Sequence, residues 1–144
     1  MSNLMHFPCP EGTFTLPQNA VFHTVNIIAF PDGCNITINR DKYAQGSTFA
    51  DYLAGQMQKL NGGLPGFKLL NEETLPAHAG FTEAHALGFS FMNQATPLWQ
   101  YTALAQVRPG ELMLFAATCP SEQAYILMRD RILTCVGDFT LQSA

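Results

Sequence analysis

The sequence predicts an α+β fold, in which a curved antiparallel sheet of six to seven strands packs two helices on one of its faces. Segments of strand character outnumber helical ones and follow one another through short turns, as the strands of hairpins do. Only two segments have helical periodicity, too few to connect parallel strands. No repeat or linker interrupts the 144 residues, so we expect residues 1–144 to form one domain.

Seven segments are rich in β-branched and aromatic residues or alternate between polar and apolar ones, as strands do. The first stops at Pro17, and the turn-forming residues 31–33 join the next two as a hairpin. Short turns around Ala95 and at residues 108–111 connect the later strands. The expected strands span residues 12–17, 21–30, 34–40, 67–76, 80–93, 97–107 and 112–119.

Two segments have the pattern of amphipathic helices. The first, residues 47–63, starts at a Ser-Thr pair that can cap it and ends at a Gly-Gly pair. Its apolar stripe consists of Phe49, Leu53, Met57 and Leu60. The second, residues 121–136, has Ser121 as its N-cap. Its stripe consists of Ala124, Met128, Ile132 and Cys135.

Charge is scarce in this sequence. Charged residues make up 12% of it, about half of the usual ~25%. None occurs from Ala84 to Val107, a stretch that holds two of the expected strands. An antiparallel sheet covered on one face normally shows charge on the other. Two interpretations remain open: a solvated sheet face built from neutral residues, or a face that a partner covers.

Composition excludes several classes of protein. The seven basic residues are scattered, so we expect no nucleic-acid binding. No apolar run is long enough to span a bilayer, so we expect no direct membrane insertion. The N-terminus lacks the pattern of a signal peptide, which favours the cytoplasm. Without export, the four cysteines are expected to be free thiols.

The sequence offers no constellation for catalysis. The histidines, His6, His23, His78 and His85, are scattered, and no nucleophile–base motif or phosphate-binding loop occurs. His85 near Glu83 is better explained as a half-buried, hydrogen-bonded side chain. No closely spaced pair of cysteines or histidines suggests zinc. We therefore expect no enzyme activity, no metal site and no cofactor.

The alternation of side chains along strands divides the expected sheet into two faces. The helix-covered face is predicted to consist of His23, Val25, Ile27, Ala29, Ile36, Ile38, Leu87, Phe89, Phe91, Trp99, Tyr101, Ala103 and Ala105. The open face is predicted to consist of Phe22, Thr24, Asn26, Ile28, Asn35, Thr37, Asn39, Ala84, Ala86, Gly88, Ser90, Leu98, Gln100, Thr102 and Leu104. This second set contains no charged residue, and its register near Leu98 to Thr102 is open by one position.

The order of elements resembles the PsbP-like and DcrB-like fold. The resemblance rests on the early "FTLP", the "VNIIAF" hairpin strand, the helix "FADYLAGQMQKL" and the closing "YILMRDRIL". Over roughly residues 10–140, the chain is most similar to the effector-associated (Eag) chaperones of bacterial type VI secretion. DcrB proteins proper resemble exported lipoproteins, whereas this sequence shows neither a signal sequence nor a lipobox.

The resemblance implies a cytoplasmic, homodimeric chaperone. Such a protein binds the apolar N-terminal transmembrane segments of a secreted effector, keeps the effector soluble and helps to load it on the secretion spike. It implies that the bound helices lie on the open sheet face, assisted by the first helix. The partner-binding residues would be Phe22, Thr24, Asn26, Thr37, Asn39, Gln58, Leu98, Gln100 and Thr102. The alternative is a carrier of a lipid or small apolar ligand, which would have a closed pocket in each subunit.

Overall fold

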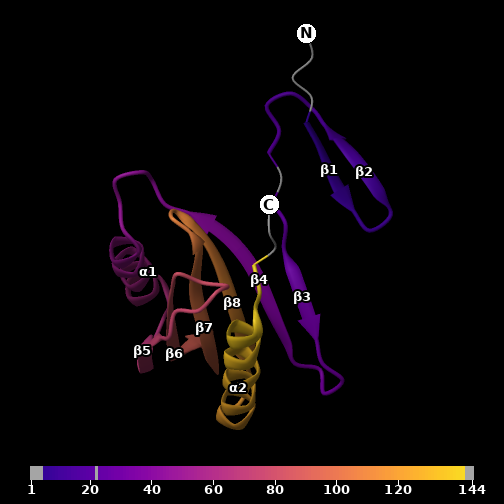
Figure 1. Cartoon of the computed structure of the whole chain (residues 1–144). Helices are drawn as coiled ribbons and strands as arrows, with labels where there is room; N and C mark the ends of the chain where they lie inside the picture. Colours follow the sequence, from indigo (N-terminus) through magenta and orange to yellow (C-terminus); the bar gives the residue numbers. More distant parts are fainter. Residues whose placement is uncertain (1–4, 22, 142–144) are drawn as a thin grey trace.

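A six-stranded antiparallel sheet forms the body of the protein (Figure 1). The computed structural model describes residues 5–21 and 23–141. The strand order is β3-β4-β8-β7-β6-β5. The strands are β3 (Asn26–Ala29), β4 (Asn35–Lys42), β5 (Lys68–Leu75), β6 (Glu83–Asn93), β7 (Thr96–Arg108) and β8 (Glu111–Cys119). The predicted α+β class and antiparallel sheet are confirmed.

A separate two-stranded hairpin precedes the sheet. It consists of β1 (Met5–Cys9) and β2 (Gly12–Leu16), paired antiparallel. Figure 1 shows it standing apart from the six-stranded sheet. The sequence analysis expected a strand at residues 12–17 but none before it.

The two helices are α1 (Phe49–Gly63) and α2 (Glu122–Asp138). Both begin with the expected hydroxyl caps, because Thr48 Oγ1 accepts a hydrogen bond from the Asp51 amide and Ser121 Oγ accepts one from the Ala124 amide, each at 3.1 Å. Beyond α1, Gly66 adopts a left-handed φ of 65° that favours glycine.

Helix α2 packs on one face of the sheet. Met128 and Ile132 are fully buried against a cluster that includes Ile36 of β4 and Phe115 of β8. The hydroxyl of Tyr125 lies over Gly88 of β6, where a Cβ would come within 1.8 Å of it. Only a glycine at this position leaves room for the helix to approach so closely.

Helix α1 packs on the opposite face, so the prediction that both helices share one face is wrong. Phe49 of α1 is buried in a second cluster, together with Leu87, Phe89, Leu104 and Leu112. Figure 1 shows the sheet between the two helices. The fold thus has three layers in its middle: α1, the sheet and α2.

Strand register explains why both helices were wrongly predicted on one face. Residues opposite each other in an antiparallel pair share a face. Leu87 lies opposite Thr102, and Ala86 lies opposite Ala103. Leu87 therefore cannot share a face with Tyr101, as the sequence analysis expected. Both faces of β6 and β7 are buried along much of their length, which accounts for most of the charge-free stretch from Ala84 to Val107.

The predicted faces of β3 are also reversed. Ile28 packs against the α2-side cluster, whereas Ile27 is 64% exposed and Val25 is 49% exposed. The cause is again register, because Ile28 lies opposite Ile36, whose side chain is buried beneath α2. The strand is also shorter than expected, with four residues.

Candidate binding surface

Helix α1 leaves part of its sheet face uncovered. Its cluster buries Leu87 and Phe89 of β6, Leu104 of β7 and Leu112 of β8. Toward β3, neither of the two described helices covers this face. One row of residues in mutual register crosses this uncovered part, and it consists of Ile27, Thr37, Ala116 and Thr102.

Flanking rows extend this surface. Asn39 lies opposite Leu114 on one side of the first row, and Thr118 lies opposite Gln100 on the other. We call the whole surface the neutral strip, which consists of Ile27, Thr37, Asn39, Leu98, Gln100, Thr102, Leu114, Ala116 and Thr118. Each of these residues is half-buried or exposed, and none carries a charge. The strip is therefore a mixed surface of methyl groups, hydroxyls and amides.

Hydrogen bonds between side chains order the middle of the strip. Gln100 Nε2 donates to Thr102 Oγ1 at 2.8 Å, and Thr118 Oγ1 donates to Gln100 Oε1 at 3.2 Å. A primary amide has two N–H donors and two acceptor lone pairs, so these bonds use half of its capacity. Gln100 is thus held in place and retains capacity for a partner.

At one end of the strip, α1 is tied to β4. The Tyr52 hydroxyl donates a 2.6 Å hydrogen bond to Asp41 Oδ2. Burial, followed by this bond to the carboxylate, raises the pKa of Tyr52 well above its ordinary value. The tyrosine therefore keeps its proton and remains a donor at physiological pH. Asp41, which follows Asn39 on the same face of β4, is thus engaged by the protein itself.

The structure brings together five of the nine residues predicted to contact a partner. They are Thr37, Asn39, Leu98, Gln100 and Thr102, all members of the neutral strip. In the stretch from Leu98 to Thr102, Leu98, Gln100 and Thr102 lie on the face that the sequence predicted for them.

The other four predicted residues lie elsewhere. Asn26 faces the α2 side, because it lies opposite Ile38. Thr24 lines a pocket and its carbonyl accepts a 3.3 Å hydrogen bond from Arg40. Gln58 is exposed, and helical periodicity places it on the side of α1 opposite Phe49. Phe22 lies outside the described residues.

The contribution of β8 was not predicted. The open face predicted from the sequence includes no residue of 112–119, but Leu114 and Ala116 are half-buried and Thr118 is exposed. Their period-two spacing was visible in the sequence. What the sequence could not show is that α1 reaches β8 only around Leu112 and Leu114 and leaves Ala116 and Thr118 uncovered.

No reactive centre occurs in the parts of the chain that the structure describes. His85 Nε2 lies 2.8 Å from Glu72 Oε1, rather than beside Glu83. Across residues 5–21 and 23–141, His, Cys, Asp and Glu side chains form no group of three that could hold a metal ion. Neither described helix has the length and apolar character needed to cross a membrane. The absence of enzyme activity and of cofactors remains a prediction.

Comparison with known proteins places the chain in a family. The model of the family described as DcrB matches residues 11–126. The chain belongs to the DcrB family. A solved structure from Pseudomonas aeruginosa, PA94, described as a protein of unknown function and a candidate regulator, is similar with a TM-score of 0.73. Its identity to the chain is 20%, and the match covers 99% of each chain. No curated protein matches.

The likeness to PA94 shows the fold of this DcrB-family chain and nothing about its ligand. The family match confirms the DcrB-like resemblance seen in the sequence. Function must therefore be argued from the surfaces of the molecule, of which the neutral strip is the most distinctive.

Proposed function

We propose that this DcrB-family protein is a cytoplasmic chaperone that holds the apolar N-terminal transmembrane segments of a type VI secretion effector. In this proposal the protein acts as a homodimer, keeps the effector soluble and passes it to the secretion spike. The observation that carries the proposal is the neutral strip: residues from four strands meet on an uncovered sheet face without a single charge.

The energetics of the strip fit a hydrocarbon-like partner. A lysine or aspartate buried against an apolar helix loses its water at a cost on the order of several kcal/mol. A threonine or glutamine costs less, because it can bond to a carbonyl or to a small polar group of the partner. Ala116 in the central row allows close approach, as small residues do between membrane helices.

Gln100 is the residue through which the strip would fix the position of the bound helix. Its amide is oriented by Thr102 and Thr118 and has capacity for further hydrogen bonds. A helix held by apolar contacts alone could slide along the sheet, whereas one amide aimed at a polar group on the helix fixes a register. The proposed role is recognition, with no bond made or broken.

The test compares two variants, each of which introduces one carboxylate at a different place on the surface. Gln100→Asp should lower affinity for the effector's apolar segment by roughly a hundredfold, equivalent to about 3 kcal/mol, because the new charge must be desolvated. Ile126→Asp is the control, since Ile126 of α2 is 46% exposed and lies on the other side of the sheet. Affinity is measured by pull-down and titration with the segment. Equal binding by both variants would place the ligand elsewhere.

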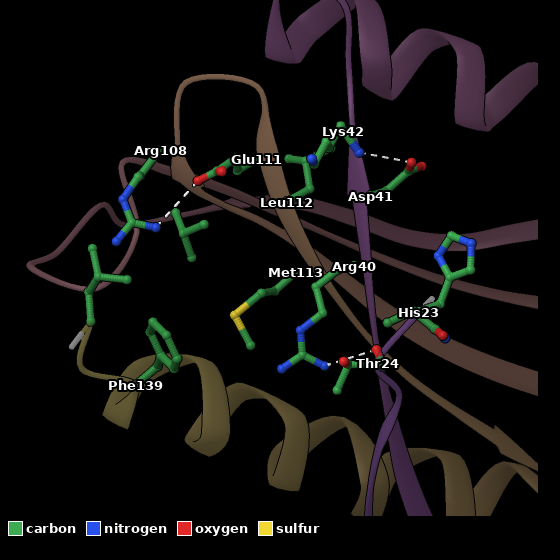
Figure 2. Close-up of a pocket in the computed structure, with 13 residues that line it drawn as sticks. His23, Thr24, Arg40, Asp41, Lys42, Arg108, Glu111, Leu112, Met113 and Phe139 are labelled. Atoms are coloured by element: carbon green, nitrogen blue, oxygen red, sulfur yellow. Dashed lines mark hydrogen bonds and ion pairs between the residues drawn. The ribbon is translucent and has the colours of Figure 1, made fainter. Parts of the chain in front are cut away.

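One observation favours the alternative of a lipid or small-ligand carrier. A pocket of about 860 Å³ lies beside β4 and the segment that follows α2 (Figure 2), with Asn39 of the neutral strip among its lining residues, and ligand sites commonly have volumes of ~300–1,000 Å³. Co-purification from the native host, with mass spectrometry of the bound species, separates the two. A stoichiometric polypeptide supports the chaperone, and a stoichiometric lipid supports the carrier.

A further inference from the structure

Two cysteines occupy matching positions on neighbouring strands of the sheet. Strands β4 and β8 are antiparallel, and at one end their pairing finishes with Thr37 opposite Ala116. Continuing this register by three residues sets Cys34, directly before β4, opposite Cys119, the last residue of β8. Opposite residues of an antiparallel pair have Cα atoms about 4.5–5.5 Å apart, a separation that a disulfide bond can span.

Both cysteine side chains also lie on the α2 side of the sheet. Cys119 is a member of the buried α2-side cluster, and Cys34 is half-buried and packs against that cluster. Burial and, after it, the neighbouring Cys34 raise the pKa of Cys119, so the two thiols are close enough to interact electrostatically. Register, face and electrostatics thus agree that the two thiols are neighbours.

The turn before Cys34 is anchored to α2. Asp32 accepts a 3.1 Å hydrogen bond from the Cys34 amide and forms a 2.9 Å ion pair with Arg131 of α2. The Arg131 guanidinium also lies over the ring of Phe30, 4.1 Å from its centroid. The Phe30 amide in turn donates a 2.9 Å hydrogen bond to the Cys34 carbonyl. Cys34 is therefore held in place, which favours its reaction with a fixed neighbour.

The ends of the two strands leave freedom for a bond to form between these cysteines. Among the described residues, no ladder pair joins β4 to β8 between Thr37–Ala116 and the cysteines. The backbone there can adjust to the specific geometry that a disulfide demands. Both cysteines are free thiols in the structure, so the pair is in its reduced form.

The two thiols differ in accessibility. Cys34, beside the turn, is half-buried, whereas Cys119 has 2% of its surface exposed. A small oxidant such as hydrogen peroxide would therefore reach Cys34 first. Burial disfavours the thiolate of Cys119, which protects it from direct oxidation but leaves it beside an oxidised Cys34. One cysteine is thus placed to be oxidised and the other to resolve the product.

We propose that Cys34 and Cys119 form a peroxide-sensitive dithiol, which closes to a disulfide bond within one chain. Hydrogen peroxide oxidises the Cys34 thiol to a sulfenic acid and is reduced to water. The Cys119 sulfur then attacks the Cys34 sulfur, the S–O bond breaks, and the hydroxyl leaves with the Cys119 proton as a second water. In a reducing compartment the bond would be transient, as redox-sensing disulfides are.

The disulfide would stiffen the sheet beneath α2. It would close a long loop that contains α1 and every strand from β4 to β8, and cross-links that close long loops restrict the unfolded chain most. Oxidation should therefore raise the melting temperature of a chain of this size by roughly 5–15 °C. This inference does not depend on what the neutral strip binds, because both cysteines lie on the other face of the sheet.

Peptide mapping of the full-length protein tests the pairing. The protein is treated with one equivalent of hydrogen peroxide, blocked with iodoacetamide in urea and digested without reduction by trypsin and a glutamyl endopeptidase. Cleavage at Glu11 separates Cys9 from Cys34, so the expected product joins residues 12–40 to residues 112–122 of the same chain. Any other pairing, a disulfide between two chains, or no disulfide would overturn the proposal.

Serine variants give an independent test by differential scanning calorimetry. Peroxide treatment should raise the melting temperature of the wild-type protein, and dithiothreitol should reverse the rise, which it could not do for oxidised methionine. Cys34→Ser should show no such rise. Cys135→Ser, at a half-buried cysteine of α2, is the matched control and should respond like the wild type. A reversible rise that persists in Cys34→Ser, or that Cys135→Ser abolishes, would refute the proposal.

Discussion

The thiol of Cys119 lies on the α2 side of β8 with 2% of its surface exposed. Burial, with a smaller contribution from Cys34, raises the pKa of Cys119 to about 11. The thiolate is the form that reacts with alkylating reagents. At a given neutral pH, a rise of about two units from the ordinary value lowers the thiolate population about a hundredfold.

Iodoacetamide should therefore alkylate Cys119 at least about a hundredfold more slowly in the native protein than in the urea-unfolded chain at pH 8. Burial against α2 slows the reaction further by restricting access. The measurement is peptide mass spectrometry over a time course. Native and unfolded chains reacting at equal rates would contradict the packing of β8 beneath α2.

At the scale of elements, the packing of α2 against the sheet depends on a few buried side chains. Met128 is fully buried, whereas its neighbour Leu127 is 43% exposed. Met128→Ala should lower the free energy of unfolding by ~2–5 kcal/mol, because it leaves a cavity between helix and sheet. Leu127→Ala is the matched control and should cost less than about 1 kcal/mol. Urea denaturation measures both, and equal losses would mean that α2 packs differently.

The sequence could define most elements but not the face that each helix covers. Helix caps and stripes are local, so both helices were predicted within a few residues. Leu87 and Tyr101 each look like core residues, and each is one, but beneath different helices. Alternation along one strand gives two faces without saying which helix covers either. That assignment needs the register between strands, here Leu87 opposite Thr102.

Only part of the candidate site was predicted, again because the face of each strand depends on the register between strands. Thr37, Asn39 and Gln100 are on the neutral strip because the two faces of their strands were predicted correctly. Asn26 is not, because β3 was assigned the wrong face. The charge-free stretch that suggested an open face is mostly buried and supplies only Leu98, Gln100 and Thr102 to the neutral strip, whereas β3, β4 and β8 supply the other six residues.

At the scale of the whole molecule, the two faces of the sheet have separate tasks in our proposals. One face carries α1 and the neutral strip, which we propose to bind the effector segment, and the other carries α2. A ligand that binds only the folded state stabilises it by mass action. An effector segment bound to the neutral strip should therefore raise the melting temperature of the protein, without any covalent change to the protein.

A helical peptide of about 20 apolar residues, the length that spans a bilayer, is a suitable probe. At a hundred times its dissociation constant, it should stabilise the protein by ~2.7 kcal/mol. For a chain of this size, that corresponds to a rise in melting temperature of roughly 5–10 °C. Differential scanning calorimetry measures the shift.

The same peptide with a central lysine should raise the melting temperature little or not at all, since the strip offers that charge no counter-ion. Gln100→Asp should abolish most of the rise with the apolar peptide, while Ile126→Asp, on the other side of the sheet, should leave it unchanged. If the two peptides stabilise the protein equally, the neutral strip does not select for apolar helices.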